Sequence, residues 1–304
     1  MPQAKFAPAQ PGGTIAVIGD LHSAWELEDL GYFNRSDYEL ILVTGDLGRS
    51  RSQDGRRVAR SLTHLLPEVL VMPGNNDVEE YPHIRAELTY RRARADLLAD
   101  TFEEESAPPV SEHARLCGYS LHPVALNGFL VTIIAGRPFS MGGPQLTFPE
   151  ALERLYQVRS LAESSERLRA LVDAVTTPHV VFVAHNGPTG LGAESEDIWG
   201  RDFDPRAGDW GDPDLRDAVE HARARGLRVL AVVAGHMHWS LHDQPERMRR
   251  WQLQDQDTLY INAARVPRVF EHEGKTVRQH IRLQLSAAGA SAEECLIPDG
   301  SNED

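Results

Sequence analysis

The chain has 304 residues, of which 41% are hydrophobic and 25% are charged, and this is the composition of an ordinary globular protein. No apolar run reaches the roughly eighteen residues that a membrane-spanning helix needs, so no membrane span is predicted. The formal net charge of -14 argues against a dedicated nucleic-acid-binding protein, because such proteins present a basic surface to the phosphates.

The composition along the chain predicts one domain between two tails. Residues 1–12 are rich in Pro, Gln and Ala and are predicted to be a disordered N-terminal tail. Residues 286–304 are small, acidic and Gly-containing, which predicts a flexible C-terminal tail and leaves 13–285 as a single domain. No secretory signal is found near the N-terminus, and Cys117 and Cys295 are too few for a disulfide framework. A cytoplasmic setting is therefore expected.

Short apolar runs alternate with longer helical patterns along the domain. Near-continuous Val, Ile and Leu runs predict strands buried on both faces at 14–18, 40–43, 69–72, 180–183 and 229–233. Helices are predicted at 24–30, 55–65, 84–98, 149–175 and 213–225, and further strands at 129–135, 259–263, 269–273 and 277–285. Residues 100–109 and 187–212 are predicted surface loops, and the second is a candidate lid or pocket wall.

Each of the five buried runs is followed directly by polar residues of the kind that bind metals. In open α/β sheets, ligands bind at the edge formed by the carboxyl ends of the strands. One such ending would mean little, but five in one chain are hard to obtain by chance. In chain order, these residues are Asp20 and His22, Asp46, Asn75, His185, and His236 with His238.

These seven side chains indicate a site for two metal ions. Seven oxygen and nitrogen donors are too many for one tetrahedral ion, but they suit two ions that share a bridging carboxylate. Two metals about 3.5–4 Å apart can clamp a phosphoryl group and bind a bridging hydroxide as the nucleophile. Carboxylate, amide and imidazole donors without thiolate favour Mn, Fe, Zn, Co or Ni, as divalent or trivalent ions.

The motifs in this order resemble those of the calcineurin-like metallophosphoesterase superfamily, which are D-x-H, G-D, G-N-H-[DE], H and G-H-x-H. The matching segments here are 19–22, 45–46, 74–77, 185 and 235–238, and the resemblance continues to Asn262. The run at 262–267 is also similar to a cyanobacterial and plastid branch of the superfamily. The resemblance implies a four-layered α/β/β/α sandwich, in which two mixed sheets are flanked by helices.

The resemblance also implies which residues hold each metal, with Asp46 as the bridge. The first ion would take Asp20, His22, Asp46 and His238. The second ion would take Asp46, Asn75, His185 and His236. Of the metals named above, Mn is expected to support activity best.

Asn76 stands where the family usually has the histidine of its G-N-H motif. In the family that histidine is commonly assigned to protonation of the leaving group or to stabilisation of transition-state charge. Asparagine releases no proton near neutral pH, although its amide still donates a hydrogen bond. Loss of a general acid costs about 10²–10⁴-fold for a poor leaving group, so phosphodiesters are favoured as substrates. Asn76 and Asp77 are the predicted catalytic residues, with Asp77 ordering Asn76 or its loop.

Arg49, which follows a metal motif, is the predicted contact to the substrate phosphate together with Asn76, because a guanidinium fork matches phosphate oxygens. Arg137 and Arg265 are weaker candidates, for which surface salt bridges are the simpler interpretation. His242 lies near the last motif and is a further candidate for the pocket. Trp199 and Trp210 are expected to cover the site, stack on a base or pin their loop.

The favoured function is hydrolysis of a small soluble phosphoester, with no stable nucleic-acid partner and no membrane. Two alternatives stay open at this point. One is a phosphomonoesterase or protein phosphatase. The other is a catalytically silent binding module, which Asn76 favours but the seven competent ligand positions disfavour.

Overall fold

The computed structural model describes residues 12–49, 54–89, 114–203, 208–242 and 244–299, and these form two mixed β-sheets. In the first sheet, β1 to β4 run parallel, and β12 pairs antiparallel with β1, β11 and β13. Its order is β11 (Val269–His272), β12 (Lys275–Ser286), β1 (Gly12–Ile18), β2 (Leu40–Val43), β3 (Glu68–Val71) and β4 (Ala114–Leu116), with β13 (Gly289–Pro298) beside β12.

The second sheet has a parallel centre and an antiparallel strand at each edge. Its order is β5 (Ser120–Leu126), β6 (Phe129–Ala135), β7 (His179–Val183), β8 (Arg228–Ala234), β10 (Thr258–Asn262) and β9 (Gln252–Asp255). All five strands that were predicted from the buried apolar runs are present, and they occupy the parallel parts of the two sheets.

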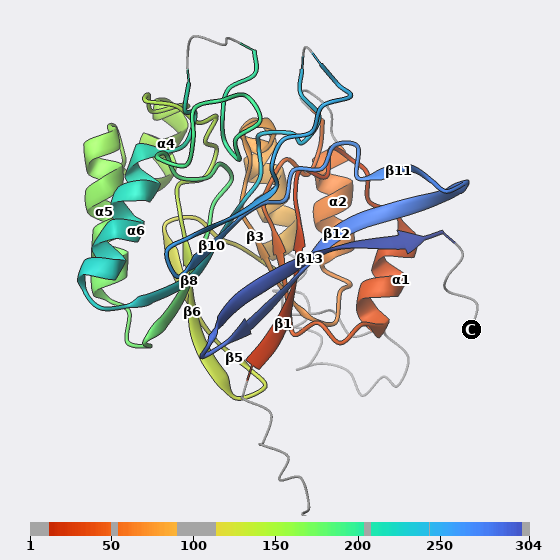
Figure 1. Cartoon of the computed structure of the whole chain (residues 1–304), viewed down its shortest axis with the longest axis horizontal. Helices are drawn as coiled ribbons and strands as arrows, with labels where there is room; N and C mark the ends of the chain where they lie inside the picture. Colours follow the sequence, from red (N-terminus) through yellow and green to blue (C-terminus); the bar gives the residue numbers. More distant parts are fainter. Residues whose placement is uncertain (1–11, 50–53, 90–113, 204–207, 243, 300–304) are drawn as a thin grey trace, which may run out of the picture.

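Helices cover the outer face of each sheet (Figure 1). Those on the first sheet are α1 (Leu27–Arg35), α2 (Asp54–Leu62) and the helical residues 81–89. Those on the second sheet are α4 (Pro149–Tyr156), α5 (Leu161–Asp173) and α6 (Pro213–Ala224). The predicted α/β/β/α sandwich is therefore confirmed. Among the described residues, no helix has the length and apolar character required to cross a bilayer.

Side-chain alternation along the strands explains why their sequences are continuously apolar. Ile15 and Val17 pack between the two sheets, whereas Ala16 and Ile18 pack under the helices of the first sheet. Successive side chains of a strand point to opposite faces, so a strand in the middle of four layers needs apolar residues at every position. The same pattern recurs in β2, where Leu42 faces the other sheet and Val43 faces the helices.

The predicted helix 149–175 is wrong as one element, because it divides into α4 and α5. Gln157 ends α4 in the left-handed conformation, with φ of 59°. Ser160 then begins α5 as its N-cap, where its hydroxyl accepts a hydrogen bond from the backbone N–H of Glu163. Both helices pack against the second sheet, so the apolar periodicity continues across the break. The sequence pattern therefore gave no sign of the turn between them.

The predicted C-terminal tail is also wrong over most of its length. Residues 289–298 form β13, which pairs with β12 from Ser286↔Gly289 to Val277↔Pro298. Its side chains are small and polar because much of this strand is only partly buried, so composition alone indicated a tail. At the other end, Gly12 already belongs to β1, while residues 1–11 of the predicted N-terminal tail lie outside the described residues.

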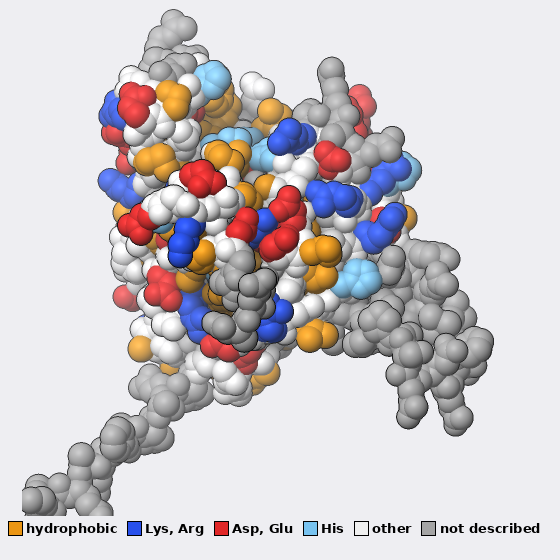
Figure 2. All heavy atoms as spheres, turned by 90° about the vertical axis from the view of Figure 1, so that its right-hand side faces the viewer, with side chains coloured by type: hydrophobic (Ala, Val, Ile, Leu, Met, Phe, Trp, Pro, Cys, Tyr) orange, Lys and Arg blue, Asp and Glu red, His pale blue; other side chains and the backbone are white. Residues whose placement is uncertain are grey.

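The other boundaries differ in smaller ways. The helix predicted at 24–30 begins later, at Leu27, and continues to Arg35. Much of the helix predicted at 84–98, and the whole loop predicted at 100–109, lie outside the described residues. Sequence patterns also missed the edge strands β4, β5 and β9, which have few of the features of a buried strand. On the face shown in Figure 2, acidic and basic side chains are interspersed.

His280 of β12 is buried beneath α1, where its Nε2 lies 2.6 Å from the hydroxyl of Tyr38. Burial, together with the positive charges of Arg268 and Arg282, lowers the pKa of His280 to about 3, from an ordinary value of 6.5. Between these two values the unfolded chain binds a proton that the folded chain excludes. This histidine therefore lowers the stability of the fold as the pH falls.

We expect His280→Gln to make the free energy of unfolding less dependent on pH. Each pH unit below 6.5 costs the wild-type fold about 1.4 kcal/mol at this residue, or about 2 kcal/mol near pH 5. Urea unfolding of both proteins at pH 7 and pH 5 measures the difference. The exposed His272→Gln serves as the control. Equal pH dependence in wild type and His280→Gln would contradict the assignment.

Candidate metal centre

The loops that follow five parallel strands meet at one edge of the sandwich. The backbone N–H of His22, after β1, donates to the carbonyl of Asp46, after β2, at 2.8 Å. Across the two sheets, Nδ1–H of His185, after β7, donates to the carbonyl of Thr44 at 2.6 Å. The N–H of Gly235, after β8, donates to the carbonyl of His185 at 2.7 Å. The residues predicted to converge at a single sheet edge therefore lie together, on loops that follow strands of both sheets.

Four of the seven predicted metal ligands have a left-handed backbone conformation, which non-glycine residues rarely adopt. The φ angles are 42° for Asp20, 41° for His22, 51° for Asp46 and 67° for His236. A residue held in such a conformation costs about 1–3 kcal/mol, and such residues cluster where a function needs the geometry. The strained backbone of these turns therefore accompanies side chains that point into one cluster.

Two glycines in the motifs allow the loops to approach closely. A Cβ atom at Gly74 would lie 2.1 Å from Oδ1 of Asp46. A Cβ atom at Gly235 would lie 2.3 Å from Oδ1 of Asp20. Any larger residue at either position would push a carboxylate out of the cluster, which explains why each motif begins with glycine.

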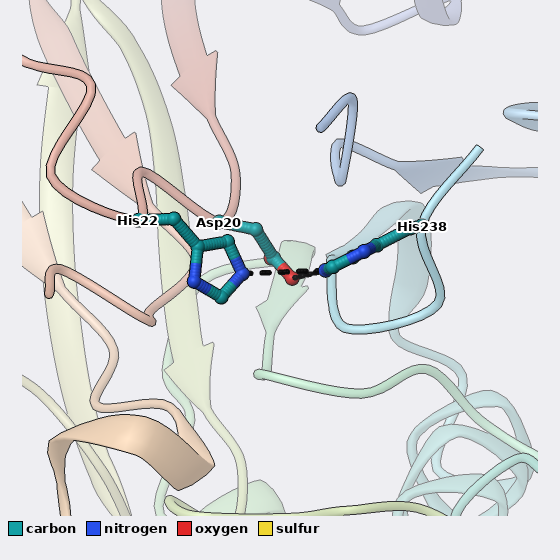
Figure 3. Close-up of side chains that lie close together, drawn as sticks. All are labelled: Asp20, His22 and His238. Atoms are coloured by element: carbon teal, nitrogen blue, oxygen red, sulfur yellow. Dashed lines mark hydrogen bonds and ion pairs between the residues drawn. The ribbon is translucent and has the colours of Figure 1, made fainter. Parts of the chain in front are cut away.

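Asp20, His22 and His238 form the first group of donors (Figure 3). The Nε2 atoms of the two histidines are 3.2 Å apart, and Nε2 of His238 is 3.5 Å from Oδ2 of Asp20. The backbone N–H of His236 donates to both oxygens of Asp20, at 3.1 Å each, and holds the carboxylate in place. Three potential ligand atoms lie within 4.8 Å of one another, which is a separation that one cation can span.

Asp46 lies between this group and a second one. Its Oδ2 is 3.7 Å from Nε2 of His22, and its Oδ1 is 3.5 Å from Nε2 of His185. Nε2 of His185 is also 2.9 Å from Oδ1 of Asn75, and the ring of His236 is centred 5.1 Å from the ring of His185. The structure therefore brings all seven predicted ligands into one cluster, with a different oxygen of Asp46 facing each side.

The hydrogen bonding of His185 fits a metal ligand. Its Nδ1–H donates to a backbone carbonyl, so in the neutral imidazole Nε2 carries a lone pair. That lone pair and the amide oxygen of Asn75 face each other at 2.9 Å. Two electron-pair donors converging in this way, with the far side of the imidazole held by a carbonyl, are what a bound cation requires.

The electrostatics of the cluster also fit a cation. Burial and the negative charge of Asp20 raise the pKa of Asp46 to about 8, despite two hydrogen bonds from Asn76. Burial opposes ionisation of Asp20, but the neighbouring histidines, led by His238, hold its pKa below the ordinary range. Burial and His185 lower the pKa of His236 to about 3, so this imidazole is neutral. Buried carboxylates that repel each other are stabilised by a bound cation.

Asn76 and Asp77 take different positions. Asn76 donates from its backbone N–H to Oδ1 of Asp46 at 2.9 Å and from Nδ2 to Oδ2 at 2.7 Å. Asp77 is buried and accepts from the N–H groups of Leu47, at 3.0 Å, and Gly74, at 2.8 Å. Asn76 thus contacts a predicted ligand directly. Asp77 joins two of the loops through their backbone N–H groups, so among the predicted catalytic residues it lies where it can order the loop of Asn76.

Within the described part of the chain, two cavities adjoin the cluster, and His22 and His238 line both of them. The smaller cavity, of about 290 Å³, is lined by Arg49, whose Nε lies 3.4 Å from the carbonyl of His22. The larger cavity, of about 420 Å³, is lined by Asn76 and by His242. Arg49 and His242 therefore lie where the sequence placed them.

The other arginine candidates lie elsewhere. Arg137 is buried and pairs with Asp212 and Asp214 at 2.8 Å each, so it forms an interior ion cluster instead of a surface salt bridge. Arg265 pairs with Glu294 at 3.1 Å and packs over the rings of Trp239 and Phe270.

Sequence reasoning missed two residues that line the larger cavity, Asp202 and Phe203. Both belong to the loop predicted as a lid or pocket wall, and its Asp and aromatic content was the available signal. The loop is a packed wall in its described part, because Trp199 is buried and Asn262 donates to the carbonyls of Ile198 and Met237, at 3.1 and 2.7 Å.

Comparison with known proteins agrees with this geometry. Residues 13–240 match the family described as calcineurin-like phosphoesterase. No match was found among proteins with curated descriptions. Among solved structures, the fold is similar to the protein TT1561 of Thermus thermophilus, with 12% identity, a TM-score of 0.51, and coverage of 93% of this chain and 98% of that one.

A second similar structure is the phosphopantetheinyl hydrolase PptH from Mycobacterium tuberculosis, with 17% identity, a TM-score of 0.46, and coverage of 84% of this chain and 89% of that one. At 12% identity the likeness to TT1561 shows the fold alone, and the likeness to PptH carries no argument, whereas the family match extends over most of the sequence. From its motifs, its sandwich and this match, the chain belongs to the calcineurin-like phosphoesterase family and is a metal-dependent phosphoesterase.

Proposed function

We propose that the protein is a dinuclear-metal phosphodiesterase that acts on a small phosphoester. The observation that carries the proposal is the position of Asp46, whose two oxygens face His22 and His185 at 3.7 and 3.5 Å. A carboxylate placed in this way is suited to bridge two ions. One ion would be held by Asp20, His22, Asp46 and His238, and the other by Asp46, Asn75, His185 and His236.

The donor set favours Mn, Fe, Zn, Co or Ni, and we propose Mn as the ion that supports activity best. Such a pair of ions supplies Lewis acidity to phosphoryl oxygens and lowers the pKa of a water nucleophile to near neutrality. The protein side chains then have to bind the substrate phosphate, orient it and exclude competing water. Arg49 is proposed to contact a phosphate oxygen, because it lines the smaller cavity beside Asp20 and His22.

Asn76 supports a preference for diesters. Its amide is held by the carboxylate of Asp46 at 2.7 Å, so it acts on the bridging residue as a hydrogen-bond donor. It cannot supply a proton to a leaving alkoxide near neutral pH. Substrates with a better leaving group, or with the lower phosphate charge of a diester, depend less on that proton.

The two cavities provide a second argument for a diester. They lie beside the same two histidines, His22 and His238, so the proposed reaction centre has space on two sides. A phosphodiester carries organic groups on two oxygens and needs room for both, whereas a monoester needs room for one. The described shape of the site therefore suits a diester better.

We expect Asp46→Asn to lose metal, because an amide is a weaker ligand than a carboxylate and bridges poorly. Metal content after dialysis, measured by mass spectrometry, should fall from about two ions per chain to about one or fewer. Asp37→Asn is the matched control, since Asp37 is exposed and pairs with Arg282 far along the chain. Unchanged metal content in Asp46→Asn would remove the proposed bridge.

We expect the manganese-loaded protein to hydrolyse bis-p-nitrophenyl phosphate with a higher kcat/KM than p-nitrophenyl phosphate. Both esters release the same coloured product, so a single absorbance assay compares them directly. The reverse order would establish the phosphomonoesterase alternative. An absence of turnover of both esters with each of the five metals, in folded protein, would favour a binding module.

We expect Asn76→His to restore an acid at this position and to raise monoester hydrolysis selectively. Phenyl phosphate has a poorer leaving group than p-nitrophenyl phosphate, so its turnover should rise by about tenfold or more relative to that ester. Asn76→Gln, which keeps an amide without an acidic proton, is the control. Equal changes for the two esters in Asn76→His would argue against a missing general acid.

A further inference from the structure

We propose that the larger cavity holds a planar aromatic group of the substrate, such as a nucleobase, stacked on Phe203. This inference rests on the proposed function and names the class of phosphoester that the site would take. The side chain of Phe203 is 50% exposed and lines the same cavity as His236 and His238. A ligand held at these histidines therefore has an aromatic surface within the same cavity.

The ring of Phe203 is built into an aromatic wall that consists of Arg201, Phe203 and Trp210. The guanidinium carbon of Arg201 lies 4.0 Å from the centre of the Phe203 ring and 4.2 Å from that of Trp210. Trp210 meets Phe203 edge to face, with ring centres 5.8 Å apart and an angle of 84° between planes. These contacts hold the Phe203 ring in place, while the residue stays 50% exposed at the larger cavity.

The wall is held at a fixed position relative to the metal centre. Buried Arg249 donates to the carbonyls of Ser195 and Asp197, at 2.6 and 3.0 Å, and to that of His238, at 3.1 Å. Its Nη2 also lies 3.3 Å from Asp202, the residue before Phe203. One guanidinium therefore ties the loop that presents Phe203 to a predicted metal ligand.

A second connection reaches the metal centre from the other end of the wall. The indole N–H of Trp210 donates to the carbonyl of Met141 at 2.7 Å. The amide of Asn186, the residue after the ligand His185, donates to the carbonyl of Trp210 at 3.0 Å. A platform fixed at both ends loses little freedom when a ligand binds, which favours specific recognition.

The chemistry of the cavity matches a nucleobase better than an alkyl chain. An exposed phenyl face binds any planar ring by stacking, and one base stacked on an aromatic side chain strengthens binding about fivefold or more. Ser240, His242 and Asn76 also line the cavity and offer hydrogen-bonding groups to the polar edge of a base. The phosphate would lie at the metal centre, with the base directed toward Phe203.

The test compares adenosine 5′-monophosphate with ribose 5-phosphate, which share a phosphate and a ribose and differ by the base. We expect the manganese-loaded protein to bind the nucleotide more tightly, by about tenfold, in isothermal titration calorimetry. Phe203→Ala and Phe203→Leu should each remove most of this difference, whereas Phe203→Trp should keep it. Leu130→Ala, which removes an exposed apolar side chain from β6, should keep the full difference.

Calorimetry reads binding without turnover, so a failure of the proposed catalysis would not hide the result. A wild-type protein that binds both phosphates equally would overturn the inference. It would also be overturned if Phe203→Leu kept the preference for the nucleotide, because apolar area without an aromatic face would then suffice. If Phe203→Ala and Phe203→Leu lost affinity for both phosphates in parallel, Phe203 would be a structural residue and the stacking site would be excluded.

Discussion

The structure depends on the convergence of buried carboxylates and imidazoles where the parallel strands of two sheets end. Asp20 and Asp46 are almost fully buried and repel each other, which raises the pKa of Asp46. A protein maintains such repulsion only when something compensates it, and a cation is the natural partner. The left-handed turns and the glycines beside the carboxylates keep these groups close in spite of the cost.

The two sheets contribute different residues to the metal centre and to the cavity beside it. The first sheet supplies the carboxylates, His22 and Asn75, and the second supplies His185, His236 and His238, so these residues meet only when both sheets pack together. The loops of both sheets then line the larger cavity. Asn262 and Arg249 fasten those walls to the residues around His238, which makes the shape of the cavity a consequence of the metal-centre geometry.

Asn76 links the chemistry to this framework. In place of a histidine, the chain has an asparagine that donates to both carboxylate oxygens of Asp46. The backbone N–H binds one oxygen and the side-chain amide binds the other. The residue therefore orients the proposed bridge, and the proton for a departing group has to come from elsewhere. The carboxylate of Asp77 accepts hydrogen bonds from the N–H groups of Leu47 and Gly74, and so it holds the turns that contain Asp46 and Asn75. The amide at position 76 thus keeps two hydrogen bonds to Asp46 and offers no acidic proton.

The sequence by itself determined the parallel strands and the seven converging residues, because buried strands require continuous apolar runs and each donor follows one of those runs directly. The sandwich was implied by the resemblance of the motifs to a known family. It did not reveal β13, the break between α4 and α5, or the burial of Arg137. Nor did it place Phe203 in the larger cavity. The burial of Arg137 and the place of Phe203 depend on contacts between segments far apart in the chain, and no local pattern records such contacts. The strand β13 and the turn between α4 and α5 are local, but small polar residues concealed the first and continuous apolar periodicity concealed the second. Only the packing of the two sheets decided which arginines, loops and aromatic rings surround the metal centre.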